Sequence, residues 1–145
     1  MSLRDGTKKM SKSDISDYSR ILMTDDNDTI VLKIKKAKTD SLSMPESENG
    51  LSKRPEIDNL INIYSSCSGL PKNNVIEQFS LKEISYFKKE LSQVLINLIE
   101  PICCEAKKLY EDKKFLNQVL SSGAIRARQL SQKTISDVYK IIGMI

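Results

Sequence analysis

Apolar residues recur at steps of three and four along much of the chain, and the longest such run covers residues 81–111. Its expected inward face consists of Ile84, Phe87, Leu91, Val94, Leu95, Leu98, Ile102, Ala106 and Leu109. The spacing predicts an amphipathic helix, because about 3.6 residues per turn bring these positions to one side. Pro101 interrupts the run. Since proline removes one backbone hydrogen bond and presses on the carbonyl of Asn97, we expect a kink or a break there.

A shorter helix is predicted within residues 24–40. Asp26 or Asp28 can cap its start, and Ile30, Ile34 and Ala37 fall on one face. The lysines of this segment are expected elsewhere on the helix, near the C-terminal end, where the helix dipole favours cations: Lys33, Lys35, Lys36 and Lys38.

The remaining segments also read as helices joined by short connections. Residues 39–56 contain two prolines and a glycine and are expected to be irregular. Helical spacing resumes at 57–68, with Gly69 as a stop and Pro71 opening the next helix. A short helix is expected before Gly123, and a last one over 124–142 with an inward face of Ala127, Leu130, Ile135, Val138 and Ile142. The fold class predicted is all-α: an antiparallel helix bundle over residues 25–145, preceded by a loop region in residues 1–24.

Composition restricts the possible catalytic and metal-binding sites more than it restricts the fold. The 145 residues include no histidine, which excludes any Ser-His-Asp or Cys-His site and any His-ligated metal within this sequence. Cys67, Cys103 and Cys104 form no metal-binding spacing, so we expect reduced, packed thiols and no metal site. No apolar run is long enough to span a membrane and no signal peptide is visible, so a cytoplasmic location is expected. The net charge of +4 permits contact with a polyanion without identifying one.

The lysine-rich stretch 8–13, KKMSKS, carries the most specific chemistry. Lysine is a compact charge on a flexible stem, suited to phosphate oxygens, while serine hydroxyls and turn N–H groups add donors. On composition alone, a stretch of this kind is usually a solvated loop. It is not a Walker phosphate loop, because GxxxxGK[ST] is missing.

The order of residues in this stretch resembles a known signature. Lys9-Met10-Ser11-Lys12-Ser13 is identical to the KMSKS motif of class I aminoacyl-tRNA synthetases. Residues 1–14 and 30–40 resemble the tryptophanyl-tRNA synthetase version of this region, 54–69 the opening of that family's helical domain, and 115–143 its C-terminal helices. The nearest alternative family is that of tyrosyl-tRNA synthetases, whose bacterial members usually vary the signature and carry a different C-terminal extension.

The resemblance implies roles for the five signature residues. Lys9 and Lys12 would bind the phosphates of ATP and stabilise pyrophosphate as it leaves during tryptophan activation. Ser11 and Ser13 would donate hydrogen bonds or shape the loop, and Met10 would anchor it to the protein. Mg²⁺ is expected to accompany the nucleotide without a binding motif of its own in this chain.

The resemblance also implies that part of the machinery lies elsewhere. The family's His-Ile-Gly-His signature and its tryptophan pocket are expected upstream. We therefore expect this chain to be a C-terminal part of a class I synthetase whose α/β nucleotide-binding fold is mostly absent, and to be inactive without that N-terminal catalytic half. The family is typically homodimeric.

The helical part is expected to bind tRNA(Trp) near its anticodon. The candidate basic residues are Lys107, Lys108, Lys113, Lys114, Arg126, Arg128 and Lys133. These charges could also be an ordinary solvated helix face. The alternative function is a non-enzymatic helical module that binds RNA or a protein partner.

Overall fold

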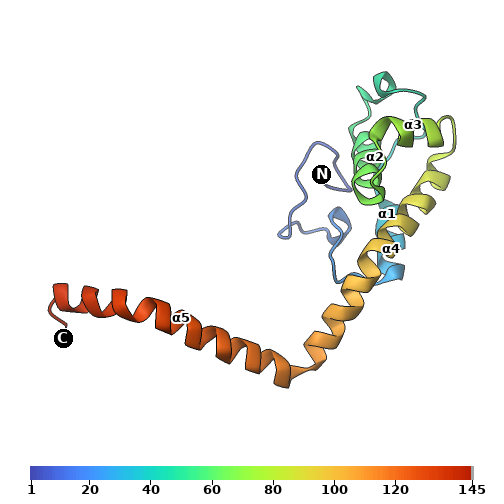
Figure 1. The fold of residues 1–145 in the computed structure, drawn as a ribbon. Coiled ribbons are helices and arrows are strands. Elements are labelled where there is room, and N and C mark those ends of the chain that lie inside the picture. The colour runs from blue at the N-terminus through green and yellow to red at the C-terminus, as the bar shows by residue number, and fades with distance from the viewer. Residues whose placement is uncertain (145) are drawn as a thin grey trace. The chain divides into compact units, whose positions relative to one another are not determined.

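A computed structural model describes residues 1–144, in which five α-helices and two 3-10 helices form and no β-strand occurs (Figure 1). The all-α class is confirmed. The elements are η1 (Asp17–Ser19), α1 (Asn27–Lys36), η2 (Glu48–Leu51), α2 (Pro55–Ser68), α3 (Lys72–Phe79), α4 (Ile84–Glu111) and α5 (Lys113–Ile141). The chain divides into two compact units, Met1–Cys104 and a second beginning at Glu105.

Helix α1 forms much as its sequence predicts, with one exception. The Asp26 carboxylate caps it by accepting a hydrogen bond from Thr29 N at 2.8 Å, and Ile30 and Ile34 are buried. The exception is Lys33, which is only 1% exposed although it was expected on the polar side. By helical spacing Lys33 lies beside the apolar face, so it needs a buried partner for its charge.

Helices α2 and α3 follow the predicted pattern closely. Proline opens α2 at its first turn, where a missing N–H costs nothing, and the predicted inward residues are all buried: Ile57, Leu60, Ile61 and Tyr64. Gly69 ends the helix in the left-handed conformation with φ of 74°, as the stop signal predicted. Pro71 stands one residue before the start of α3 at Lys72 and is not itself helical.

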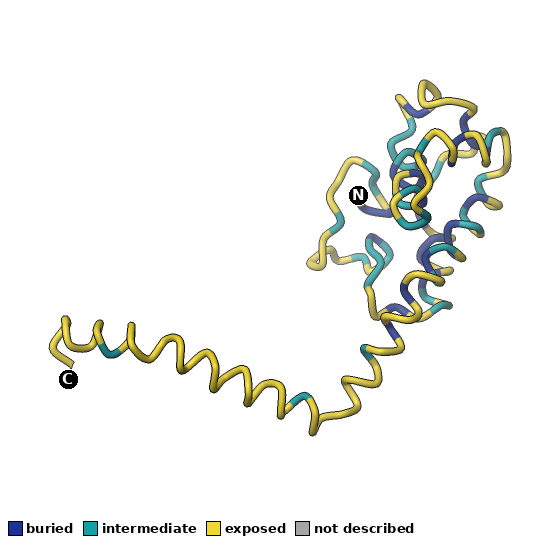
Figure 2. Tube along the Cα trace, viewed as in Figure 1, coloured by how far each residue is buried: buried dark blue, intermediate teal, exposed yellow. Residues whose placement is uncertain are grey.

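Helix α1 lies antiparallel to the first part of α4. Near the start of α1, Asn27 donates to Glu100 at 3.0 Å, while at its end Ala37 O accepts from Lys88 Nζ at 2.7 Å. Burial lowers the pKa of Lys88, which holds the last carbonyls of α1. The core that these helices share with α2 and α3 is dark blue in Figure 2.

Three aromatic rings join α2, α3 and α4 in this core. Phe79 and Phe87 stack edge to face with ring centroids 5.0 Å apart, and Tyr64 lies 5.2 Å from Phe79. All three side chains are buried. Edge-to-face geometry is the arrangement that the quadrupoles of aromatic rings favour.

Helix α4 continues through Pro101, so the break considered from sequence does not occur. Pro101 is exposed, where water can satisfy the backbone carbonyl that proline leaves without a donor. The buried face also differs from the predicted one beyond Leu95: Ile99 and Cys103 are buried, whereas Leu98 and Ile102 are exposed.

Helix α5 differs most from the prediction. It is one continuous helix through Gly123, and none of its described residues is buried, as the yellow trace in Figure 2 shows. The five residues predicted to face inward are therefore exposed: Ala127, Leu130, Ile135, Val138 and Ile142. A single glycine costs a helix only about 1 kcal/mol, too little to break it. Periodicity identifies a shared face, but it does not supply a partner for that face within the chain.

The three cysteines are free thiols in different surroundings. Cys103 is buried and its Sγ lies 3.6 Å from Thr24 O, while Cys67 is half-buried and burial raises its pKa. Cys104 is exposed, so it is not the packed thiol that was expected.

Candidate phosphate-binding loop

The signature loop grows out of a fixed N-terminal segment. Ser2 N donates to Lys8 O at 2.7 Å, and Leu3 N donates to Ser19 O at 2.9 Å. Leu3 O in turn accepts from Lys38 N at 2.8 Å, just after helix α1. Both Ser2 and Leu3 are buried. The segment thus joins the start and the end of the loop region to the end of α1.

Close packing against helix α2 fixes the same segment from the other side. The Asn59 side-chain amide donates to Met1 O and Ser2 O at 3.2 and 3.1 Å. A Cβ atom placed on Gly6 would lie only 2.3 Å from Pro55 O. Glycine is therefore required at position 6, because no side chain fits between the loop and the start of α2.

Short-range polar contacts shape the approach to the signature. Asp5 accepts hydrogen bonds from the hydroxyl and the backbone N–H of Thr7 at 2.6 and 3.0 Å, and these bonds hold the pKa of the Asp5 carboxyl below its usual value. Lys8 lies 3.3 Å from the same carboxylate. Of the three lysines in 8–13, Lys8 therefore has an anionic partner within the loop.

The two lysines that belong to the signature itself have no such partner. Lys9 and Lys12 are exposed, and no carboxylate among residues 1–144 lies within ion-pair distance of either. Between them Met10 is half-buried and packs against the hydrophobic core, which is the anchoring position expected of it. The loop thus presents two free ammonium groups on either side of an apolar anchor.

The serine hydroxyls of the signature contact each other. Ser11 Oγ and Ser13 Oγ are 3.0 Å apart, and Ser13 N donates to Ser11 Oγ at 3.3 Å. A cavity of about 560 Å³ opens beside them, lined by Ser2, Arg4, Asp5, Lys8, Lys9, Ser11, Ser13 and Asp14. The ammonium, guanidinium and hydroxyl donors among these residues suit phosphate oxygens, while the two carboxylates restrict where an anion can bind.

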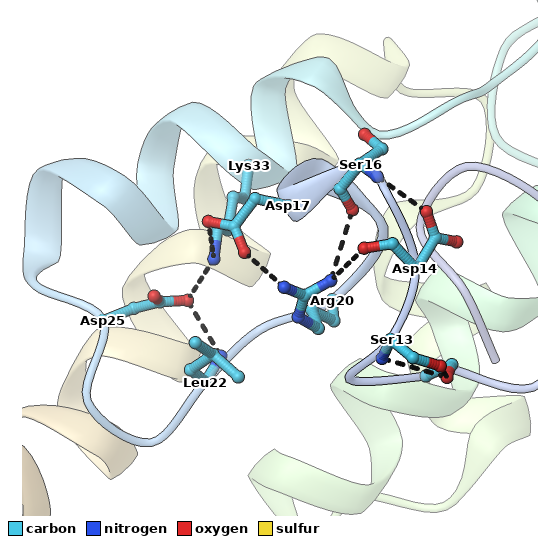
Figure 3. Close-up of polar contacts among 9 residues, drawn as sticks. Ser13, Asp14, Ser16, Asp17, Arg20, Leu22, Asp25 and Lys33 are labelled. Carbon is cyan, nitrogen blue, oxygen red and sulfur yellow. Dashed lines mark hydrogen bonds and ion pairs between the residues drawn. The ribbon is translucent and has the colours of Figure 1, made fainter.

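An ion-pair network that was not predicted from the sequence joins the segment after the signature to helix α1 (Figure 3). Arg20 pairs with Asp17 at 2.8 Å and donates to Asp14 O at 3.1 Å. The buried Lys33 of α1 pairs with Asp25 at 2.7 Å and reaches Asp17 at 3.3 Å. The sequence signal for this network was the position of Lys33 on the apolar side of α1, three residues after Ile30.

All seven candidate tRNA-contacting residues are exposed and lie in the second unit: Lys107, Lys108, Lys113, Lys114, Arg126, Arg128 and Lys133. Lys107 and Lys108 precede the α5 cap residue Asp112, and Lys113 and Lys114 follow it. Residues 105–145 contain eight basic and four acidic side chains, so the net charge of the whole chain, +4, falls in this unit. Lys108 pairs with Glu105 at 2.6 Å.

Two features are absent from residues 1–144. No three side chains of His, Cys, Asp or Glu gather where they could hold a metal ion. None of the helices described combines the length and apolar character needed to cross a membrane.

Comparison with known proteins assigns the chain to a protein family. The sequence profile of the tRNA synthetases of class I (W and Y) matches residues 1–100, which include the signature and helices α1 to α3. The chain therefore belongs to the class I tRNA synthetase family of the tryptophan and tyrosine type.

The individual relatives are tryptophan enzymes. A tryptophan–tRNA ligase of Agrobacterium fabrum is 45% identical over 145 residues, and one of Rickettsia felis is 44% identical over the same length. The match covers 100% of this chain but only 41% and 43% of those proteins. The crystal structure of tryptophanyl-tRNA synthetase from Mycoplasma pneumoniae superimposes with a TM-score of 0.67 at 25% identity, covering 99% of this chain and 44% of that one.

Proposed function

We propose that this chain supplies the ATP-phosphate loop and the helical tRNA-binding part of a tryptophan–tRNA ligase. The proposal rests on one observation: in a chain of this family, the ammonium groups of Lys9 and Lys12 are exposed and form no ion pair within residues 1–144, while Met10 between them packs on the core. Charges left free on an anchored loop suit a ligand that brings its own negative charge.

The proposed chemistry is adenylate formation. The carboxylate of tryptophan attacks the α-phosphorus of ATP, the bond to the β-phosphate oxygen breaks, and pyrophosphate leaves with its negative charge. Lys9 and Lys12 would hold the β- and γ-phosphates, and their charges would stabilise the departing pyrophosphate. Ser11 and Ser13 would orient the loop and donate to phosphate oxygens. Mg²⁺, where it accompanies the nucleotide, would neutralise part of the phosphate charge.

The two proposed functions would belong to consecutive segments of the chain. Residues 1–24 would handle ATP, and the helices of residues 25–145 would position tRNA(Trp). The concentration of net positive charge in residues 105–145 supports contact of that unit with a phosphate backbone. The tryptophan pocket and the other nucleotide contacts would belong to the N-terminal catalytic part that accounts for the remaining length of the relatives, working in the cytoplasm as a homodimer.

Tryptophan-dependent exchange of pyrophosphate into ATP tests the proposal. The chain is assayed alone and together with the upstream part of the Agrobacterium fabrum relative. We expect exchange only in the mixture. Lys12→Ala in the mixture should lower kcat by about 10²- to 10³-fold, the usual loss for a group that acts on charge developing in the transition state.

The affinity for tryptophan should change little in the same variant, because the proposed role of Lys12 is contact with the phosphates of ATP. Lys53→Ala, which removes an exposed lysine from the connection before α2, is the matched control and should leave exchange unchanged. Full exchange activity of the Lys12→Ala mixture would refute a phosphate role for the loop.

Binding of tRNA(Trp) is tested separately by its salt dependence. Replacing Lys113 and Lys114 together by alanine should weaken binding and reduce the slope of log affinity against log salt by about one to two, since each phosphate contact contributes about 0.7 to 0.9. An unchanged slope would show that these lysines face solvent only.

A further inference from the structure

The segment that follows the signature is held on helix α1 by four charged side chains, here called the clasp: Asp17, Arg20, Asp25 and Lys33. Their formal charges sum to zero, and each cation contacts at least one carboxylate. Figure 3 shows the Lys33 ammonium between Asp17 and Asp25, and Arg20 between Asp17 and the backbone of Asp14 and Ser16. None of these residues belongs to the signature itself.

One half of the clasp is a buried anchor. Lys33 is 1% exposed and Asp25 is 9% exposed, and Lys33 Nζ lies 2.7 Å from Asp25 Oδ2. The same oxygen accepts a hydrogen bond from Leu22 N at 2.8 Å, so it also fixes the turn that leads into α1. Because both charges are desolvated, neither can leave the other at low cost.

The other half, here called the latch, joins the exposed carboxylate of Asp17 to the mostly buried guanidinium of Arg20. Asp17 has 61% of its side chain exposed and contacts both cations, Arg20 at 2.8 Å and Lys33 at 3.3 Å. Among residues 1–144, Asp17 is therefore the only residue whose carboxylate lies within ion-pair distance of both Lys33 and Arg20. Because water can solvate the Asp17 carboxylate, its contacts open at lower cost than the buried anchor, although the Arg20 side chain is only 15% exposed.

Arg20 carries the connection to the signature. Its guanidinium donates to Asp14 O at 3.1 Å and to Ser16 O at 3.5 Å, and Asp14 directly follows Ser13. The signature is thus held at both ends: at Lys8 O by Ser2 N, and at Asp14 by Arg20. Tyr18, within the same segment, adds a contact to α1, because Lys36 Nζ lies 4.1 Å from the centre of its ring.

We propose that Asp17 and Arg20 are positioning residues that latch the C-terminal end of the signature loop to Lys33 of helix α1. Opening the latch frees the loop to move while the buried anchor keeps the helix in place. The significance of this latch for catalysis rests on the proposed function, but its existence does not, and the two can be tested apart.

Trypsin gives a local readout, because the signature contains its own cleavage sites at Lys9 and Lys12. Asp17→Asn removes the latch carboxylate without creating or deleting a site. We expect cleavage after Lys9 and Lys12 to become at least about two- to fivefold faster, the factor that corresponds to an ion pair whose carboxylate is exposed. Cleavage after Lys53 in the connection before α2 serves as the internal reference and should keep its rate.

Two variants make the result specific. Asp17→Glu keeps the carboxylate and should restore most of the protection. Asp58→Asn removes another partly exposed carboxylate, paired with Lys72 at 2.6 Å on the α2–α3 side, and should leave cleavage at Lys9 and Lys12 unchanged. Thermal unfolding of each variant shows whether the fold is kept.

In the mixture with the upstream part, Asp17→Asn should lower kcat for pyrophosphate exchange while the KM for tryptophan stays constant. If that mixture shows no exchange even without substitution, the proposed function fails and the trypsin result still decides the latch. Equal cleavage rates at Lys9 and Lys12 in Asp17→Asn and the unaltered chain, or an equal acceleration at Lys53, would overturn the latch.

Discussion

The two compact units use similar residues in opposite ways. In residues 1–104, apolar side chains from four helices meet in one core and the basic and acidic residues balance at fifteen each. In residues 105–145, none of the described apolar side chains of α5 is buried and the charge is +4. Leu130 of α5 is 85% exposed, whereas Leu91 of α4 is fully buried.

This contrast separates two sources of helix formation. The helices of the first unit are stabilised mainly by tertiary burial, which allows an exposed proline in α4 and a short helix such as α3. Helix α5 has no buried residue, so its own length, its Asp112 cap and its residue propensities must maintain it. Substitutions should therefore act through cavities and buried charges in the first unit, and through local helix propensity in the second.

The largest effect is expected from Phe87→Ala. This removes a fully buried ring that contacts Phe79 and Tyr64, and the cavity should lower the free energy of unfolding by about 3–5 kcal/mol. Leu130→Ala in α5 removes an exposed side chain and should change it by less than about 0.5 kcal/mol. Urea unfolding followed by circular dichroism measures both, and similar losses in the two variants would erase the contrast between the units.

A comparable loss, about 3 kcal/mol or more, is expected from Lys33→Met, because it leaves the Asp25 carboxylate buried without its cation. The double variant Lys33→Met/Asp25→Asn removes both charges and should recover part of the stability. Lys36→Met, on the exposed side of the same helix, loses only the contact with the Tyr18 ring and should cost about 0.5–1 kcal/mol. A loss for Lys33→Met no greater than for Lys36→Met would show that burial of Lys33 carries no penalty.

Acid should weaken the first unit through Asp40. Arg54 donates two hydrogen bonds of 2.7 Å to this carboxylate and holds the pKa of Asp40 below its usual value. A carboxyl with a lowered folded-state pKa contributes stability above its unfolded pKa of about 3.9, and that contribution is lost as pH falls through the folded-state value.

Asp40→Asn should therefore cost stability at pH 7 and very little in strong acid. Because Asp40 is partly exposed, solvent screening keeps the neutral-pH cost below about 1 kcal/mol. Urea titrations of both proteins at neutral and acidic pH measure the difference. A gap between the two proteins that widens on acidification would have the wrong sign.

A small gain in stability is expected from Gly123→Ala in α5. A Cβ atom at this position meets no atom within 4 Å, so alanine should raise the local helix stability by about 0.5–1 kcal/mol. Hydrogen exchange should slow for the amides around residue 123 and remain unchanged in α2. Faster exchange would indicate that α5 needs the glycine for another reason.

Much of the first unit could be predicted from sequence because local signals and burial agree there. The Asp26 cap, the inward face of α2 and the Gly69 stop each follow from nearest neighbours along the chain. The register of the second half of α4 could not be predicted in the same way. Whether Leu98 or Ile99 is buried depends on what packs against the helix, and the periodicity accommodates both.

The candidate site likewise contains residues that the sequence predicted and contacts that it did not. The signature residues were found from their order alone, and the structure adds that Lys9 and Lys12 are free while Lys8 is paired. Their binding to ATP stays a prediction. The clasp was missed because it joins Asp17 to Lys33, sixteen positions apart, through the burial of a lysine that was assigned to the polar side of α1.

The contrast between Cys103 and Cys104 has a practical consequence. Cys103 is buried and Cys67 is half-buried with a raised pKa, so a maleimide dye at neutral pH should react first with the exposed Cys104. That thiol is the last residue of the first unit. A single fluorophore attached there, without any mutagenesis, would make this position an anisotropy probe for the proposed binding of tRNA and of the upstream part.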